Sequence, residues 1–330
     1  MHQYFTRVSS EATEYLAQYR KGRVRRPLSI SLNKNMYPPG ESAQSSWLPI
    51  AFRAFNELAK QKPAKDMLII GSGNGIDALG AIEIFDLRAL TVTDLFEDNL
   101  ALIRENIVAN LEQETKTEVS FCSGSLLSGI PADRRYSLIY ENLPNIPLPE
   151  GLYIKDGTNS ASFFNPEHNG VPKVFVTNLL VLHYLLLQQA QTRLRAGGGV
   201  LTCIGGRVPL EVVFDLHRSC GYSPELLVFD IKIQSEPEMV LPFYCKAREQ
   251  TGIEFQYYRP GAMEVVAAAR SSGLEGQQLA NAVEVDLGRF AISPDEALAR
   301  VRQGKDVAHT VFMTFAGLAK EADAAGLLFK

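Results

Sequence analysis

The chain has 330 residues, of which 46% are hydrophobic and 21% are charged, and its formal net charge is −4. This apolar content excludes disorder for most of the chain, because burial of that surface offsets the entropy lost on ordering. The negative balance argues against a dedicated nucleic-acid binder, and the longest near-apolar run, Leu179–Leu187, is far shorter than the roughly 20 residues of a membrane span.

Short apolar runs alternate with helical patterns along most of the chain. Apolar residues at helical spacing predict a helix over Ser46–Ala59, which Pro63 prevents from continuing. The alternation that follows predicts an α/β fold with a mostly parallel sheet and helices on both faces. The expected strands are 67–70, 89–93, 118–121, 137–140, 200–204, 226–233, 253–258 and 309–315, and the expected helices are 76–85, 97–111, 177–194 and 210–219.

A glycine-rich turn follows the first of these strands. It reads Gly71-Ser72-Gly73-Asn74-Gly75 and leads into a helix. Glycines allow a tight turn and close backbone approach, and a helix N-terminus favours anionic or polar ligand groups. A dinucleotide fingerprint requires glycine where this chain has Ile76, which disfavours a nicotinamide oxidoreductase. A structural turn without a ligand remains an alternative.

The second strand ends in an acidic residue. Asp94, followed by Leu95, lies nineteen residues after Gly75. A carboxylate at this end of the neighbouring strand can accept hydrogen bonds from both ribose hydroxyls of a nucleoside. It can also cap the helix that begins near Glu97, and the two roles can coexist. Together with the glycine turn, Asp94 predicts a nucleoside site.

Three motifs together resemble those of class I S-adenosylmethionine-dependent methyltransferases. The G-x-G-x-G spacing at 71–75 is similar to their first motif, and glycines at 197–199 resemble their turn before the fifth strand. Asn142-Leu-Pro-Asn145 is similar to the Asn-Pro-Pro-aromatic motif of enzymes that methylate nitrogen. Within the class, the chain resembles release-factor glutamine methyltransferase relatives. It resembles the methyltransferase module of plant methionine S-methyltransferases more closely, through residues 121–127, 143–146 and 205–207.

The resemblance spans about residues 46–258 and implies a Rossmann-like class I methyltransferase fold. That fold has a mostly parallel seven-stranded sheet with an antiparallel closing strand. We expect an N-terminal helical cap over the active site (1–60), a cofactor-binding core (61–258) and a C-terminal extension packed on the core (259–330).

The resemblance also implies S-adenosyl-L-methionine as the cofactor. Ser125 stands where an Asp commonly binds the adenine amine, and Asn145 stands where an aromatic ring would stack on the substrate. The motif's Asn, here Asn142, would accept a hydrogen bond from the target amine or amide. The implied cofactor-binding residues are Gly71, Ser72, Gly73, Gly75, Asp94, Leu95, Ser125 and Asn142.

Glu141 and Asn142 are the candidate catalytic residues, because they supply a carboxylate and an amide oxygen after the fourth strand. A carboxylate can hold a guanidinium bidentately, whereas a thioether needs no hydrogen-bond acceptor. This favours nitrogen over sulfur as the methylated atom. A solvent-facing or helix-capping role for Glu141 remains open.

Tyr37, Phe164 and Arg207 are the candidate substrate-binding residues. Arg207 could clamp an amino-acid carboxylate bidentately, or it could pair with Glu211 instead. The polar segment 155–168, which contains Phe164, has the length and position of a lid or of a mobile surface loop.

These residues predict methyl transfer to a side-chain nitrogen of a small amino-acid-like molecule, such as the guanidinium of free arginine. Methionine S-methylation and methylation of a protein glutamine are the alternatives, and a non-catalytic cofactor-binding subunit is a different class. The basic cluster Arg20–Arg26 is a solvated surface, unless it supports nucleic-acid methylation instead.

No apolar signal core lies near the N-terminus, and the four widely spaced cysteines form no paired motif. We therefore expect reduced core thiols, no metal site, no membrane contact and a cytoplasmic location. Monomer and homodimer both remain open.

Overall fold

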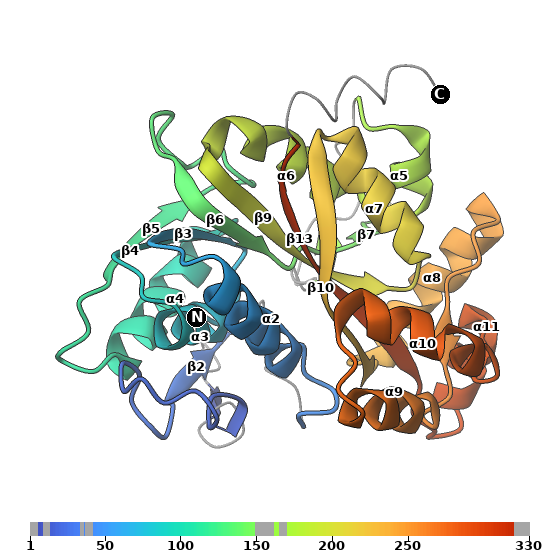
Figure 1. Ribbon diagram of the computed structural model, residues 1–330. Helices are drawn as coiled ribbons and strands as arrows, with labels where there is room; N and C mark the ends of the chain where they lie inside the picture. The colour runs from blue at the N-terminus through green and yellow to red at the C-terminus, as the bar shows by residue number, and fades with distance from the viewer. Residues whose placement is uncertain are drawn as a thin grey trace.

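One twisted sheet with helices on both faces forms the centre of the computed structural model, which describes residues 6–8, 14–33, 36, 42–148, 162–164 and 170–319 (Figure 1). In spatial order its main strands are β5 (Glu118–Ser123), β4 (Ala89–Asp94), β3 (Asp66–Ile70), β6 (Tyr136–Glu141), β9 (Leu194–Gly206), β13 (Ala308–Leu318) and β10 (Tyr222–Ile233).

The strand directions complete the topology. Strands β5, β4, β3, β6 and β9 are parallel, whereas β13 is antiparallel to both β9 and β10. This is the Rossmann-like class I methyltransferase fold with its antiparallel closing strand, as the sequence predicts. Two short strands, β11 (Tyr257–Tyr258) and β12 (Ala291–Ile292), extend the sheet from β13, so it has nine strands instead of the expected seven.

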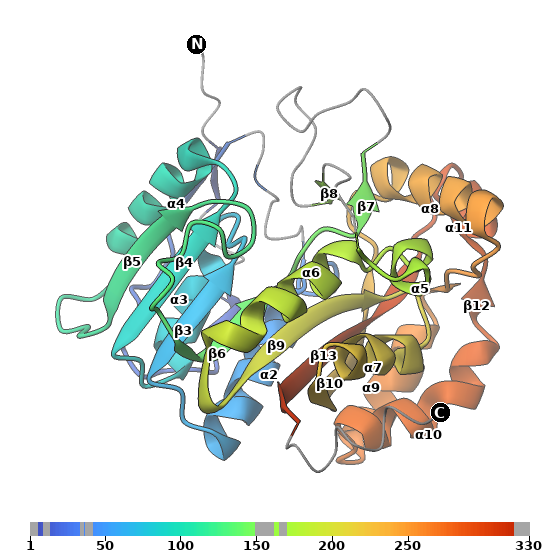
Figure 2. The same cartoon turned by 90° about the horizontal axis from the view of Figure 1, so that it is seen from above.

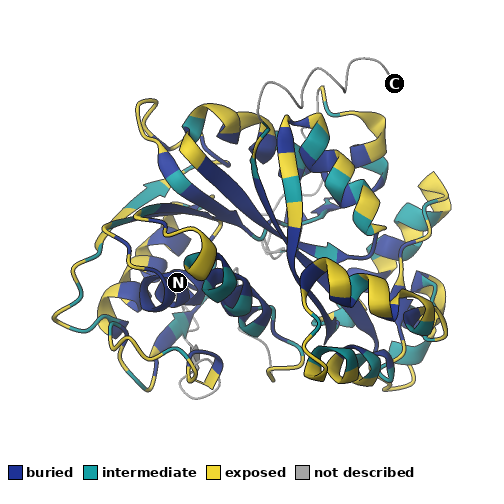
Figure 3. Ribbon diagram, in the orientation of Figure 1, coloured by how far each residue is buried: buried dark blue, intermediate teal, exposed yellow. Residues whose placement is uncertain are grey.

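The central strands are apolar because both of their faces are covered. Along β3, Met67 and Ile69 join the core on one face, and Leu68 and Ile70 join the core on the other. Figure 3 shows this sheet as the most deeply buried part of the molecule. Helices α2 (Leu48–Gln61), α3 (Ile76–Ile84) and α4 (Glu97–Asn110) cover the first face, and α6 (Val181–Ala190) and α7 (Leu210–Ser219) cover the second (Figure 2).

Helices α2 and α3 approach closely at a glycine. A Cβ atom built on Gly80 of α3 would lie 2.0 Å from Cε1 of Phe52 on α2, so only glycine fits there. The remaining elements are β1 (Thr6–Val8), β2 (Ile30–Leu32), β7 (Ile146–Pro147), β8 (Phe163–Phe164), α5 (Lys173–Thr177), the 3-10 turn Gln191–Arg193, α8 (Pro237–Thr251), α9 (Ala262–Ser271), α10 (Gly276–Gly288) and α11 (Pro294–Val301).

Two sequence predictions of secondary structure are wrong. The expected helix over 177–194 is interrupted between α5 and α6, where Leu179 has a left-handed φ of 58°, and Leu194 already belongs to β9. The expected strand over 253–258 covers only Tyr257 and Tyr258, and helix α8 precedes it.

The C-terminal region contributes directly to the sheet. Strand β13 comes from the segment expected to form an extension, yet it lies between β9 and β10. The expected boundary at residue 258 therefore does not separate a core from an extension. The late strand itself was predictable from its apolar run over 309–315.

The basic cluster Arg20–Arg26 is anchored to helix α3. The fully buried carboxylate of Glu83 accepts hydrogen bonds from the backbone N–H groups of Gly22, Arg23 and Val24 at 2.9–3.1 Å. The guanidinium of Arg26 lies 3.5 Å from the same carboxylate. The charge of Arg26 is thus paired inside the protein, where it stabilises the N-terminal segment.

Helix α4 holds strand β2 through two asparagines one turn apart. Asn110 accepts from the N–H of Ser29 at 2.7 Å and donates to its carbonyl at 2.8 Å. Asn106 contacts Ser31 in the same way, at 2.8 and 2.9 Å. Each amide side chain therefore makes the two backbone hydrogen bonds that a neighbouring strand would otherwise make.

We expect Glu83→Gln to lower the free energy of unfolding by about 3 kcal/mol or more, because it leaves buried N–H groups and Arg26 without their carboxylate. Urea unfolding measures this difference. The control is Glu57→Gln, since the exposed pair Glu57–Lys60 should contribute less than about 1 kcal/mol. Equal losses in the two variants would contradict the anchoring role of Glu83.

Candidate active site

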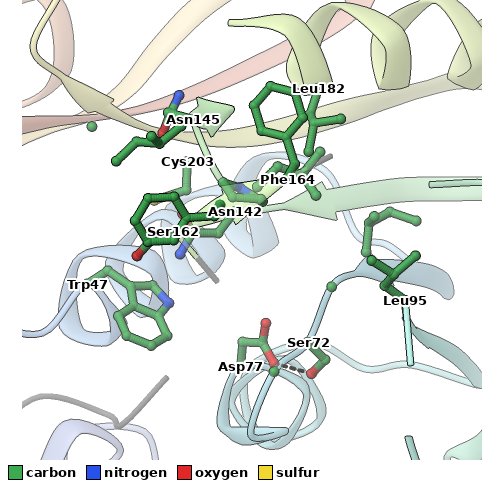
Figure 4. Close-up of a pocket in the computed structure, with 18 of the residues that line it drawn as sticks. Trp47, Ser72, Asp77, Leu95, Asn142, Asn145, Ser162, Phe164, Leu182 and Cys203 are labelled. Atoms are coloured by element: carbon green, nitrogen blue, oxygen red, sulfur yellow. Dashed lines mark hydrogen bonds between the residues drawn. The ribbon is translucent and has the colours of Figure 1, made fainter. Parts of the chain in front are cut away.

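A cavity of about 580 Å³ opens at the edge of the sheet where the parallel strands end. The strand order reverses between β3 and β6, and ligands of open α/β sheets bind at such a switch point. The lining follows the sheet. The turn after β3 and the end of β4 lie at one side, the loop after β6 lies in the middle, and the ends of β9 and β10 with the start of β13 lie at the other side. Figure 4 shows part of this lining.

The glycine turn after β3 is left-handed at three positions. Gly71, Gly73 and Gly75 have φ values of 66°, 61° and 86°. A Cβ atom on Gly75 would also lie 3.3 Å from Ile107 of helix α4. The turn therefore needs glycine, and it brings Gly71, Ser72 and Gly73 to the cavity, whereas Gly75 lies behind them as the N-cap of α3.

Asp94 and Leu95 line the cavity beside this turn, at the end of β4. The Oδ1 atom of Asp94 accepts from the N–H of Phe96 and from the amide of Asn99, each at 3.2 Å. Burial raises the pKa of this carboxyl above its ordinary value. Helix α4 begins after Phe96 without a side-chain cap, so Asp94 bonds to the residue before the helix and does not cap it. Its location in the cavity leaves the ribose-binding role in place as a prediction.

A second buried carboxyl, Asp77, lies in the first turn of α3 and was not predicted from the sequence. Its Oδ1 accepts from Oγ of Ser72 at 2.5 Å and from the N–H of Ala78 at 2.7 Å. Burial raises its pKa from 3.8 to about 7, and these two hydrogen bonds oppose the rise. Figure 4 shows Ser72 and Asp77 bonded to each other at the cavity wall.

Glu141 does not lie where the sequence analysis expected it. It is fully buried and is not among the residues that line the cavity. One carboxylate oxygen is 2.8 Å from Nδ1 of His183, and the other accepts from the N–H of Leu143 at 3.0 Å. The expectation that Glu141 holds a substrate guanidinium directly is therefore wrong, because both of its carboxylate oxygens already have partners inside the protein.

The loop after Glu141 forms the middle of the cavity wall. Asn142, Leu143, Pro144 and Asn145 all line it. In Figure 4, Asn142 and Asn145 lie across the cavity from Ser72 and Asp77. The candidate catalytic amide of Asn142 is thus in the cavity, and Asn145 occupies the wall without offering an aromatic ring.

Arg207 lines the far side of the cavity, after β9. Its guanidinium donates to Oε1 of Gln234 at 2.5 Å and lies over the ring of Tyr244, 4.9 Å from the centroid. The alternative pairing with Glu211 is not what the structure shows, since that carboxylate contacts Arg218. The aromatic ring and the amide hold Arg207 in place beside the cavity.

Lys232 and His309 join Arg207 at this side, and the sequence analysis missed both. Burial, together with Arg207, lowers the pKa of Lys232 to about 7, and Nζ donates to Oγ of Ser235 at 3.0 Å. Burial also holds the pKa of His309 well below its usual range. Lys232 is a lysine in an otherwise apolar strand, and this was the signal that could have revealed it. Asp230, two residues earlier, gives the strand the alternation of a solvent-exposed face and hides that signal.

Three predicted site residues remain: Ser125, Phe164 and Tyr37. Ser125 and Phe164 line the cavity. Tyr37 lies outside the described residues, as does most of the segment 155–168. Trp47, at the N-terminal end of α2, also lines the cavity and was not predicted.

Among the described residues, no group of histidine, cysteine and acidic side chains could hold a metal ion. The four cysteines are unpaired thiols, and burial raises the pKa of Cys220 and of Cys245 to about 11. No helix in the described ranges is both long and apolar enough to cross a membrane.

No protein-family model matches the sequence, and no curated protein does. Solved structures with similar arrangements include a ribosomal protein L11 methylase from Lactobacillus delbrueckii subsp. bulgaricus, at 17% identity over 54% of this chain and 70% of that one, with a TM-score of 0.37. A methyltransferase from Pyrococcus furiosus is 17% identical over 66% of this chain and 87% of its own, with a TM-score of 0.40. A cyclopropane synthase from Mycobacterium tuberculosis is 13% identical over 82% and 84%, with a TM-score of 0.39. Strand order, more than these distant matches, defines the fold.

We expect Asp77→Asn to flatten the pH dependence of stability. Between about pH 4 and pH 7 folded Asp77 keeps a proton that the unfolded chain has lost, so the free energy of unfolding falls as pH rises. Asn keeps the Oδ1 acceptor but cannot ionise. Urea unfolding across this range should show the variant gaining on the wild type by at most about 1.4 kcal/mol per pH unit. Parallel pH profiles would contradict the raised pKa.

Proposed function

We propose that the protein is an S-adenosylmethionine-dependent methyltransferase. The observation that carries this proposal is the cavity at the switch point, which combines a left-handed glycine turn with a buried carboxylate at the end of the adjacent strand. A nucleoside fits this combination, because the turn allows close approach and Asp94 can accept from ribose hydroxyls. The class I fold supports the same conclusion.

The described residues fit the cofactor part by part. Asp94 would hold the ribose, and Leu95 and Ser125 lie beside it to contact the base. Gly71, Ser72 and Gly73 would approach the rest of the molecule with their backbone. When bound, the cofactor supplies an activated methyl group on a sulfonium.

Asp94→Ala should weaken binding of S-adenosylmethionine roughly 10- to 100-fold, because it removes charge-assisted hydrogen bonds to the ribose. Isothermal titration measures the affinity. Asp94→Asn separates charge from side-chain volume, and Asp98→Ala, an exposed acid on α4, is the matched control that should bind like the wild type. No binding to the wild type would overturn the cofactor assignment.

We propose a small amino-acid-like substrate whose carboxylate binds Arg207 and Lys232. Two cationic side chains at the far side of the cavity favour an anion, and a planar guanidinium can hold a carboxylate bidentately. The loop Asn142–Asn145 lies between these cations and the part of the cavity lined by the glycine turn and Asp94. It would therefore face the transferred methyl group. Holding both reactants in line there is the main contribution of the protein, and proximity accounts for up to about 7–11 kcal/mol of such barriers.

We further propose that the methylated atom is a side-chain nitrogen, such as one of the arginine guanidinium group. The amide of Asn142 in the cavity supports nitrogen, because it can accept from an N–H group. Methionine S-methylation and methylation of a protein glutamine are the competing acceptors. A non-catalytic subunit would bind the cofactor without methylating any acceptor.

An amino-acid panel followed by mass spectrometry decides the acceptor. We expect a basic amino acid to gain the mass of one methyl group, and Arg207→Met to raise its KM at least roughly tenfold through loss of the carboxylate contact. Lys246→Met, an exposed lysine on α8, is the control. Methylation of methionine alone would refute the nitrogen assignment, and cofactor binding with no methylated acceptor would favour the non-catalytic class.

Carboxylate binding should weaken as pH rises from about 7 to 9. Lys232 loses its charge above about pH 7 in the free protein, and a bound carboxylate favours the charged form, so binding takes up a proton. Neither of its neighbours His309 and Cys203 changes charge in this range, because burial lowers the pKa of the first and raises that of the second. Calorimetry in two buffers of different ionisation enthalpy measures the proton uptake, which Lys232→Met should abolish.

A further inference from the structure

A chain of buried hydrogen bonds runs from the end of β6 to the cavity wall. Oε1 of Glu141 is 2.8 Å from Nδ1 of His183 on helix α6. Nε2 of the same imidazole is 3.2 Å from the side-chain amide of Asn145, which lines the cavity. Glu141 and His183 are both fully buried, whereas Asn145 is only partly buried.

The direction of these bonds follows from one backbone carbonyl. The Asn145 amide nitrogen lies 3.0 Å from the carbonyl oxygen of Leu179, which can only accept. That atom is therefore the NH2 group, and its contact with His183 makes the imidazole Nε2 an acceptor. The single proton of the imidazole must then lie on Nδ1, where the Glu141 carboxylate accepts it.

Backbone geometry supports this arrangement. Leu179 has a left-handed φ of 58°, an uncommon conformation for a residue with a side chain, at the break between α5 and α6. The break leaves the Leu179 carbonyl to accept from Asn145. The second oxygen of Glu141 accepts from the N–H of Leu143, so the same carboxylate fixes the loop that carries Asn145.

With its NH2 group engaged on the buried side, Asn145 has one polar atom left, the carbonyl oxygen Oδ1. We propose that Glu141 and His183 act as positioning residues that present Oδ1 of Asn145 to the methyl acceptor, so that the site selects an acceptor carrying an N–H group. This rests on the proposed methyl transfer. It also replaces the direct guanidinium contact first expected of Glu141 with an indirect role.

The acceptor nitrogen donates its N–H to Oδ1, which directs its lone pair to the methyl carbon. The N–C bond would form from that lone pair, and the electrons of the broken C–S bond would go to sulfur, leaving a neutral thioether. One proton leaves the nitrogen to water as the N–C bond forms, so a singly charged guanidinium is still singly charged after the transfer. A thioether acceptor has no N–H, and would leave Oδ1 facing it without a donor.

The first test reads the imidazole directly by nitrogen NMR of His183, assigned with His183→Ala. We expect protonated Nδ1 and unprotonated Nε2 in the wild type. Glu141→Gln leaves only one oxygen for two donors, the N–H of Leu143 and Nδ1–H of His183. The imidazole proton should therefore move to Nε2, and the side-chain amide of Asn145 should rotate by 180° to accept it. A wild-type proton on Nε2 would overturn the proposal whatever the substrate is.

The second test measures binding of L-arginine and L-methionine in the presence of S-adenosylhomocysteine, which prevents turnover. The fluorescence of Trp47 reports it, since this is the chain's one tryptophan and it lines the cavity. Asn145→Ala should weaken arginine binding roughly tenfold and change methionine binding less than about twofold. Asn281→Ala, an exposed asparagine on α10, should change neither.

The outcomes separate this inference from the proposed function. Equal weakening of both amino acids in Asn145→Ala, or wild-type preference for methionine, would overturn acceptor selection while leaving methyl transfer intact. Absence of binding by both amino acids would contradict the amino-acid substrate and the selection that rests on it. Failure of the wild type to bind S-adenosylhomocysteine would contradict the proposed function itself.

Discussion

Parallel strand pairing is the constraint on which the rest of this structure depends. Parallel strands end at the same edge of a sheet, so the loops that follow them lie close together there although they are far apart in the sequence. The order reversal between β3 and β6 then separates the loops that follow these strands and opens the cavity. Because β13 runs antiparallel, its first residues, including His309, reach the same edge as the last residues of β10.

Buried polar groups give the two sides of this cavity opposite character. Beside the glycine turn, Asp77 and Asp94 are carboxyls whose pKa values burial raises. On the far side, Arg207 and Lys232 are cations, and burial lowers the pKa of Lys232. Such groups are costly to bury unless hydrogen bonds or ligands stabilise them, which is why shifted pKa values often mark functional sites. The two sides of the cavity therefore differ in the charge that their buried groups can carry.

Sequence patterns located the elements whose signal is local. The glycine turn, the acid at the end of β4 and helix α7 all follow from spacing within a few residues, and the structure places them where expected. Helix α8 was missed, and it contains Pro242, a residue that argues against a helix. The break at Leu179 was also missed, since an apolar run gives no local sign of a left-handed residue. Glu141 was misplaced for a similar reason: a carboxylate after a strand usually faces the cavity, and its partner His183 lies forty-two residues away in an apolar helix.

The sequence by itself determined the fold class, the glycine turn and the residues that follow the parallel strands, because backbone conformation and burial of apolar runs are local properties. Only the tertiary structure decided that β13 lies inside the sheet, that Lys232 and His309 join Arg207, and that Glu141 is buried behind the cavity wall beside His183. These depend on which strands pair and which side chains are excluded from water. Both follow from contacts between residues far apart in the chain, which local sequence spacing does not encode.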